Sequence, residues 1–167
     1  MQLLPLHIQH AKPLLEFELS NRDWFESHIA PRATDFYHLT GVQTHIAELL
    51  LDQTLGKALP YLIVNQHQTI VGRVNLHNIH DGKAFLGYRV GEKYIGRGVA
   101  KSAVSQMLNI AQQPPITQLI AIASVQNLAS QSVLTSQGFT AKSQLTNFTQ
   151  VQGTMLDCIE YQLNLAN

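Results

Sequence analysis

The 167-residue chain has little cysteine and little charge. Its single cysteine, Cys158, excludes an intrachain disulfide and any metal site built from several cysteines. Charged residues make up 13%, and 11 Lys and Arg balance 11 Asp and Glu, so no overall field favours nucleic acid or an anionic membrane. No apolar run approaches a membrane span, and the segment MQLLPLHIQH lacks the features of a signal peptide. We expect one cytoplasmic domain over residues 1–167, whose 45% hydrophobic content provides a core.

Residues 85–112 combine a strand, a glycine-rich corner and a helix. Strand formers run up to Val90, and apolar residues recur at helical spacing from Val99. The corner contains three glycines, Gly91, Gly96 and Gly98. Three cations surround it, Lys93, Arg97 and Lys101. Glycine permits positive φ and close approach of a ligand, while the first amides of a helix have no partner within the helix. The corner is therefore predicted to bind phosphate.

The spacing of this corner distinguishes between phosphate-binding families. A P-loop pattern, GxxxxGK[ST], could begin at Gly91, but Arg97 and Gly98 occupy the positions of the required lysine and hydroxyl. A dinucleotide pattern, GxGxxG, could begin at Gly96, but it fails at Lys101 and no βαβ unit leads into it. A plain glycine turn before an amphipathic helix remains open.

Periodicity and turn signals predict the remaining elements. Strands are expected over 3–8, 61–65, 69–79, 83–90 and 119–125, helices over 11–19, 41–57, 99–112 and 127–136, and an antiparallel pair within 139–165. A helix followed by a loop is expected within 21–36. Asp81-Gly82 is the strongest hairpin signal, and Gln152-Gly153 lies near the last turn. Pro114 and Pro115 are expected to end the helix that precedes them.

The corner resembles the acyl-CoA pyrophosphate loop of the GCN5-related N-acetyltransferase (GNAT) family. That loop reads [Gln/Arg]xxGx[Gly/Ala], and this chain has a cation, xxGxG and a small residue at Lys93, Gly96, Gly98 and Ala100. Lys93 departs from the usual first residue. The order of elements is also that of the family, and residues 127–139 resemble its segment of Asn, helix and Gly-Phe.

Other residues resemble one branch of the family, the ribosomal-protein N-terminal acetyltransferases of the RimJ/RimL type. These are Ser130, three residues after Asn127, together with Asp157 and Tyr161. The stretch NRDWFESHIAPR, residues 21–32, resembles the first helices of that branch. The resemblance implies an α/β (α+β) fold with a mixed, mostly antiparallel sheet of about seven strands, helices on both faces, and splayed fourth and fifth strands.

The resemblance also implies positions for acetyl-CoA. Main-chain groups of Tyr88, Arg89 and Val90 would hold the pantetheine arm and the thioester carbonyl. The pyrophosphate would bind amides of the corner, which are those of Ile95, Gly96, Arg97, Gly98, Val99 and Ala100. Asn127 would contact the arm from the far side, although an asparagine there is also a good helix N-cap.

The reaction implied is direct attack of a primary amine on the acetyl thioester. In the Rim-type branch the serine matched by Ser130 is the proposed proton donor, but a hydroxyl in the first turn can also satisfy a helix amide. Many relatives carry a tyrosine where this chain has Leu134. No acid lies between Gly138 and Gly153, so the general base is not identified. The candidates elsewhere are Glu26, Asp35 and Glu92.

Two further groups of residues are expected to have mainly structural roles. His77 and His80 are three apart in an extended strand, on opposite faces and without an apparent third ligand, so we expect no metal site. His77 could still face the acceptor cleft as a proton relay. Four aromatic residues are expected to line the core or an acceptor groove, with the core favoured for most of them: Trp24, Phe25, Phe36 and Tyr37.

Three functions stay open at this point. The first is acetylation of a peptide or protein N-terminus, whose amine has a pKa of about 8 against about 10.4 for lysine and so demands little of a base. The second is acetylation of a small-molecule amine. The third is a CoA-binding sensor without turnover. We expect no nucleic-acid or membrane partner, and a monomer or homodimer.

Overall fold

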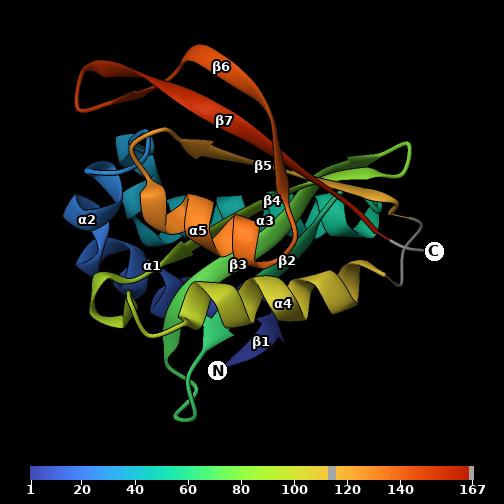
Figure 1. Cartoon of the computed structure of the whole chain (residues 1–167). Coiled ribbons are helices and arrows are strands. Elements are labelled where there is room, and N and C mark those ends of the chain that lie inside the picture. Colours follow the sequence, from blue (N-terminus) through green and yellow to red (C-terminus); the bar gives the residue numbers. More distant parts are fainter. Residues whose placement is uncertain (113–115, 166–167) are drawn as a thin grey trace.

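The structure is a computed structural model that describes residues 1–112 and 116–165, which form a seven-stranded sheet with helices on both faces (Figure 1). The strand order is β1-β2-β3-β4-β5-β7-β6. The strands are β1 (Gln2–Pro5), β2 (Leu59–Val64), β3 (Ile70–His80), β4 (Lys83–Val90), β5 (Gln118–Ser124), β6 (Thr140–Val151) and β7 (Thr154–Asn164). Neighbouring strands are antiparallel except β4 and β5, which are parallel. The predicted mixed, mostly antiparallel sheet is confirmed.

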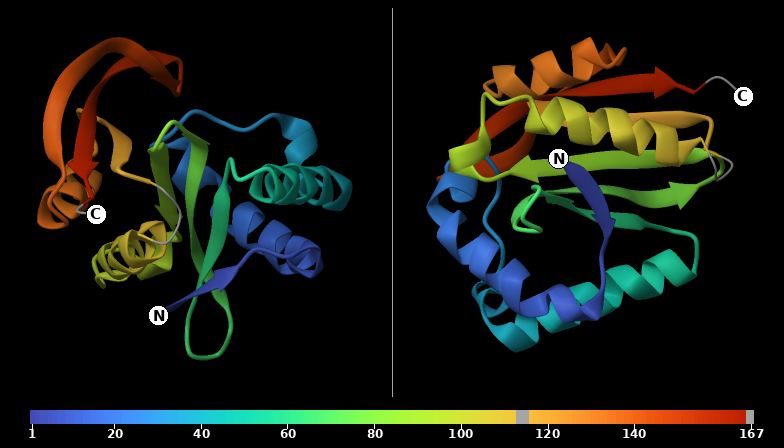
Figure 2. Two further views of the ribbon diagram at one scale, coloured as in Figure 1. Left: turned by 90° about the vertical axis from the view of Figure 1, so that its right-hand side faces the viewer. Right: turned by 90° about the horizontal axis from the view of Figure 1, so that it is seen from below.

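The helices are divided between the two faces of the sheet (Figure 2). They are α1 (Ala11–Ser20), α2 (Arg22–Glu26), α3 (Leu39–Thr54), α4 (Val99–Ala111) and α5 (Leu128–Ser136). Short 3-10 helices occur at Ile8–His10, Thr34–Tyr37 and Glu92–Tyr94. Helices α1 to α3 cover one face, and α4 and α5 cover the other. None of the helices within the described ranges is long and apolar enough to cross a membrane.

Each face has its own apolar core because the strands of the sheet alternate their side chains between the two faces. The core beneath α4 and α5 includes Val74, Leu76, Met107, Leu119 and Leu134. The core beneath α1 and α3 includes Leu14, Phe17, Ile46, Leu62 and Val64. Phe25, Phe36 and Tyr37 belong to this second core, so the expectation that most of these aromatic residues are buried is confirmed.

Local turn chemistry sets several element ends. Asp81 and Gly82 both have positive φ (48° and 73°), as do Gln152 and Gly153 (48° and 80°), which is the geometry of tight hairpin turns. Helix α5 ends at Ser136, two residues before Gly138, whose φ is 88°, and the Phe139 amide donates to the Leu134 carbonyl at 3.1 Å. Both predicted hairpins and the predicted glycine stop are confirmed.

The first strand is shorter than predicted. It ends at Pro5 rather than residue 8, because His7 and His10 form a capping box that turns residues 8–10 into a 3-10 helix. The His7 imidazole accepts from the Gln9 amide at 3.3 Å, and His10 accepts from the His7 amide at 3.0 Å. Helix α3 begins two residues before the predicted start, at Leu39. The two prolines expected to end α4 lie outside the described residues.

Strands β4 and β5 pair only at their beginnings. The parallel register joins Lys83, Ala84 and Phe85 to residues 118–120 and goes no further. Beyond Phe85, strand β4 remains paired with β3 on its other side up to Val90. The two central strands therefore diverge toward their carboxyl ends, which confirms the predicted splay. This end of β4 leads directly into the glycine corner.

Candidate active site

The glycine corner presents unpaired amides to solvent. Gly96 and Gly98 have φ values of 70° and 73°, and Gly98 is the N-cap of α4. Ser102 is the first residue after the corner whose amide bonds back, to the Gly98 carbonyl at 2.9 Å. Within the described residues, the amides of residues 96–101 have no hydrogen-bond acceptor. Such an array of exposed amides at the start of a helix fits a phosphate group.

Gly91 has a different role from the one expected. Its φ is −61°, so it needs no positive-φ conformation. A Cβ at this position would lie 3.0 Å from Asn21 Oδ1 and 3.1 Å from Phe17 Cε2. Asn21 Oδ1 also accepts from the Glu92 amide at 2.9 Å. Gly91 therefore allows the corner to pack against the end of α1, and its close approach is to this chain rather than to a ligand.

The edge of β4 that faces β5 has open main-chain groups. The Gly91 amide donates to the Val71 carbonyl at 2.9 Å, and Arg89 is paired with Arg73 across the ladder. In an antiparallel ladder the direction of these groups alternates, so those of Tyr88 and Val90 point toward β5. No strand pairing uses them there in the described chain. A ligand with amide groups could bond to this edge as an added strand.

The Tyr88 side chain reaches α5 across the same gap. Its hydroxyl lies 2.9 Å from Ser130 Oγ and 3.3 Å from the Ser130 carbonyl oxygen. Burial raises the pKa of Tyr88 above its usual value, although the hydrogen bond to Ser130 acts in the opposite direction. Tyr88 is therefore protonated at neutral pH. The Ser130 hydroxyl faces another hydroxyl and has no helix amide as a partner among the described residues.

Asn127 caps α5. Its Oδ1 accepts from the Ser130 amide at 3.0 Å, so the capping role is confirmed, and within the described residues its Nδ2 has no acceptor. Leu134, where many relatives carry a tyrosine, is 1% exposed and packs in the core. A phenol at Leu134 would thus replace a core side chain. In this chain the phenol beside Ser130 comes from β4 instead.

A buried charge cluster lies on the other face of the sheet. Glu18 of α1 is fully buried and Arg73 of β3 is 3% exposed, and their side chains are hydrogen-bonded at 3.0 Å. Arg89 of β4 binds the second Glu18 oxygen at 3.1 Å, and Arg32 lies 3.7 Å from the first. One carboxylate thus faces three guanidinium groups. Burial favours a higher pKa for Glu18, but the charges of Arg89, Arg73 and Arg32 outweigh it and lower the pKa.

His45 of α3 completes the cluster as a neutral acceptor. Its Nε2 lies 2.9 Å from Arg73 NH2, and a guanidinium can only donate, so this nitrogen is unprotonated. Burial, together with the charges of Arg73 and Arg32, lowers the pKa of His45 to about 3. The imidazole therefore adds no positive charge at neutral pH. The cluster of Glu18, Arg32, Arg73 and Arg89 carries a net charge of +2.

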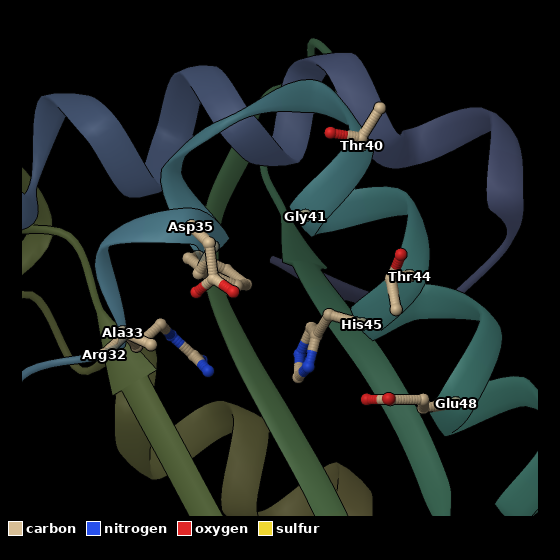
Figure 3. A pocket seen from close by; sticks show the side chains of 9 residues that line it. Arg32, Ala33, Asp35, Thr40, Gly41, Thr44, His45 and Glu48 are labelled. Carbon is tan, nitrogen blue, oxygen red and sulfur yellow. The ribbon is translucent and has the colours of Figure 1, made fainter.

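A pocket of about 530 Å³ opens beside this cluster (Figure 3). Residues 32–36 and the first half of α3 form its walls. Arg32 and His45 point into it from opposite sides, with Asp35 and Glu48 around it. A Cβ at Gly41 would overlap the Asp35 carbonyl oxygen and lie 2.9 Å from Phe36 Cα, so glycine is required where the two walls meet. We call this space the Arg32 pocket.

A smaller pocket of about 290 Å³ lies between α2 and the β6–β7 turn. It is lined by Asp23, Glu26, Pro31 and Gln152. The Glu26 carboxylate is 2.9 Å from Arg22 Nε and accepts from the Tyr37 hydroxyl at 3.4 Å. Two of the base candidates, Glu26 and Asp35, thus line different pockets. The third, Glu92, is an exposed residue whose amide bonds to Asn21.

Comparison with known proteins assigns the family. The sequence model of the acetyltransferase (GNAT) domain family matches residues 1–140 of this chain. The chain belongs to the GNAT acetyltransferase family. It is an acyl-CoA-dependent acetyltransferase, as the resemblance of the corner implies. A curated relative, "Probable N-acetyltransferase YjcK" of Bacillus subtilis (strain 168), is 29% identical over 142 residues, which cover 81% of this chain and 77% of the relative.

Solved structures with the same fold include a ribosomal-protein acetyltransferase and a RimJ protein. The ribosomal-protein-S5-alanine acetyltransferase of Vibrio fischeri superposes with a TM-score of 0.93 at 19% identity, covering 98% of this chain and 92% of that one. RimJ of Mycobacterium smegmatis, in complex with CoA-disulfide, gives a TM-score of 0.87 at 20% identity, covering 97% and 80%. The predicted likeness in fold to RimJ/RimL-type acetyltransferases is confirmed.

The structure brings most of the predicted site residues to one region and adds several that sequence reasoning missed. The corner, the end of β4 and the start of α5 lie around the splay. The missed groups are the Tyr88 hydroxyl and the Glu18 cluster. A charged residue at i+4 from Leu14 on the apolar stripe of α1 is a signal that could have revealed Glu18.

Each of the two histidines of β3 contacts a neighbouring side chain. The His77 ring stacks on Phe85 with ring centroids 5.8 Å apart, and His80 Nδ1 lies 3.5 Å from Asp81. The ladder is interrupted between them, and Asn78 has a φ of 50°. Over residues 1–112 and 116–165, no group of three His, Cys, Asp or Glu side chains could hold a metal ion.

Proposed function

We propose that this chain moves an acetyl group from acetyl-CoA to the α-amine of a peptide or protein N-terminus by direct attack in a ternary complex. The observation that carries the proposal is the arrangement around the splay. Unpaired corner amides, an open β4 edge and the Tyr88–Ser130 hydroxyl pair lie where the two central strands diverge. We further propose that residues 1–167 are one acetyltransferase domain and that it acts in the cytoplasm.

The residues present fit acetyl-CoA, which when bound supplies the activated acetyl thioester. Amides of residues 96–100 would bind the pyrophosphate, with Arg97 and Lys101 adding positive charge. The role expected for Ile95 stays a prediction, since its amide donates to the Glu92 carbonyl at 3.3 Å. Main-chain groups of Tyr88 and Val90 would bind the pantetheine arm, and Asn127 would offer its free Nδ2. The role expected for the main chain of Arg89 stays a prediction, since its paired position on the ladder turns it toward β3.

The hydroxyl pair would supply the proton that the departing thiolate needs. Either hydroxyl of the pair can donate to the other at 2.9 Å, so a proton lost from Ser130 can be replaced from Tyr88. Burial keeps the Tyr88 phenol protonated at neutral pH. This pair would do what a tyrosine at position 134 is expected to do in many relatives. It supports turnover by a chain that lacks that tyrosine.

Two observations favour an N-terminal amine as the acceptor. The Vibrio fischeri structure is named for acetylation of an alanine of ribosomal protein S5. An α-amine, with a pKa of about 8, is partly neutral at neutral pH and can react without a strong base. The pocket between α2 and the β6–β7 turn, with Asp23 and Glu26, offers a place where an ammonium could enter before it loses its proton.

The corner is tested by Gly96→Glu and Gly98→Glu. Each change puts an anionic side chain where the phosphates would bind, so we expect CoA affinity to fall at least about a hundredfold by calorimetry. Gly56→Glu is a matched control, because Gly56 also has a φ of 70° and open space around its Cβ position. Loss of affinity in all three variants, or in none of them, would reject the assignment.

The proton donor is tested by Ser130→Ala and Tyr88→Phe. If the pair donates a proton, both changes should lower kcat about tenfold to a hundredfold and leave KM for acetyl-CoA nearly unchanged. Thiol release with a panel of N-terminal peptides and small amines gives both the rates and the acceptor class. Unaltered kcat with reduced thermal stability would show that the pair only holds α5 against β4.

A further inference from the structure

The guanidinium of Arg32 has few interaction partners for a group whose side chain is largely buried. Its side chain is 23% exposed, and none of its five N–H donors makes a hydrogen bond within the described residues. Its Nε is buried without a partner, and its contact with Glu18 is 3.7 Å, longer than a hydrogen bond. Stacking on the Phe36 ring at 4.3 Å compensates only in part. An unpaired buried donor such as this Nε requires an explanation.

The other two arginines of the cluster do not share this deficit. Arg73 bonds both to Glu18 and to His45, and Arg89 bonds to Glu18 at 3.1 Å. They occupy both oxygens of the Glu18 carboxylate. Arg32 is thus the cation for which the cluster has no well-placed anion, and the net charge of +2 leaves an anion favoured beside it.

The Arg32 pocket offers room and further donors for such an anion. The hydroxyls of Thr40 and Thr44 line it and, within the described chain, make no hydrogen bonds of their own. Asp35 and Glu48 also line it, but both are exposed, so solvent screens their charges more than those of the buried arginines. Their presence disfavours a doubly charged phosphate and favours a singly charged carboxylate.

The pocket is connected to the proposed reaction site. Arg32 and Arg89 approach the same Glu18 carboxylate, and Arg89 lies on β4 between Tyr88 and Val90, at the splayed end. An acceptor whose amine reaches the splay from the α1–α3 face would therefore pass Arg32. A carboxylate carried a few bonds from that amine could pair with the guanidinium.

We propose that the Arg32 pocket binds a carboxylate of the acceptor, so that acceptors with an acidic group near the reacting amine are preferred. This rests on the proposed function and specifies its substrate class. Arg32 is the specificity-determining residue, through bidentate bonds from its free donors. Asp35 and Glu48 limit the affinity because they repel the same carboxylate.

The test compares peptides that are amidated at the C-terminus and differ only by Asp or Asn at the second, third or fourth position. We expect the Asp peptide to have about a tenfold or greater advantage in kcat/KM at one of these positions, mainly through KM. Arg32→Gln should remove the advantage, and Asp35→Asn should increase it. Lys12→Gln, an equal charge change on the exposed side of α1, should leave it unchanged.

A further comparison identifies the source of the carboxylate, and the choice of variants controls for misfolding. Free amino acids are compared with their amides, and a preference confined to them would assign the pocket to an α-carboxylate. Arg32→Gln keeps both Glu18 bonds to Arg73 and Arg89, so it should fold. Arg32→Lys, which keeps the charge but loses the planar fork, should retain part of the preference.

Binding can be measured without turnover. Calorimetry with N-acetylated Asp and Asn peptides measures binding to the pocket even if the protein acetylates none of the amines. A lack of acetylation would reject the proposed function but not the carboxylate site. Tighter binding of the Asp product, lost in Arg32→Gln, supports the carboxylate site. Equal binding of both products, or an Asp preference that survives Arg32→Gln, overturns it.

Discussion

The two faces of the central sheet are built on different principles. Beneath α4 and α5 the core is apolar, and the polar groups proposed to act on CoA are backbone amides at its edge. Beneath α1 and α3 the interior contains Glu18, Arg73 and a neutral His45. One face thus keeps its polar chemistry at the surface, whereas the other places charge inside the protein. The comparison indicates that the second face is the more sensitive to single polar substitutions.

The largest effect is expected for Glu18→Gln. The change keeps the size of the side chain but leaves three arginines without their buried counter-charge, which typically costs about 4 kcal/mol in the free energy of unfolding. Urea unfolding measures it, and Glu16→Gln, on the exposed side of the same helix, should change stability by less than about 0.5 kcal/mol. Similar small losses for both variants would mean that the cluster does not stabilise the fold.

The matching change on the apolar face is Met107→Ala. Met107 is fully buried in the core beneath α4, so truncation leaves a cavity that should cost about 3 kcal/mol. The loss should be the same at every pH between 5 and 8, because no titrating group is involved. Asn109→Ala, exposed on the same helix, is the control. A stability loss that varied with pH would contradict the expected difference between the two faces.

Near neutral pH, the smallest effect is a pH dependence that belongs to the charged face. The pKa of His45 is lowered to about 3 in the folded chain, so between pH 6.5 and 3 the unfolded chain binds more protons than the folded one. Stability should therefore fall as pH decreases through this window, by about 1 kcal/mol per pH unit. The lowered pKa of Glu18 adds a loss only as the pH falls below its ordinary value of 4.5.

The His45 contribution can be isolated above pH 4.5. His45→Gln keeps an acceptor for Arg73 but cannot be protonated, so its stability should decline less steeply between pH 6.5 and 4.5 than that of the unchanged chain. The remaining slope comes from His10 and His77, whose pKa values burial also lowers. His67→Gln, in the exposed β2–β3 turn, should retain the slope. Parallel slopes in all three proteins would show that another group is responsible.

Sequence patterns predicted the elements whose signals are local. The Asp81-Gly82 hairpin, the glycine stop at Gly138 and the start of α4 at Gly98 were all readable, because positive φ and capping depend on residues close together in the chain. The first strand was misjudged because His7 and His10 form a local capping box that apolar spacing does not reveal. Gly91 was misjudged because its constraint comes from α1, far away in sequence.

By itself, the sequence determined the family, the order of the strands and helices, and the corner that exposes amides, since each follows from spacing along the chain. Only the tertiary structure decided that Tyr88 meets Ser130, that Glu18 lies among three arginines, and that Arg32 has no hydrogen-bond acceptor among the described residues. The physical reason is that hydrogen bonds and ion pairs depend on distances between residues 42 to 71 positions apart, which periodicity does not encode.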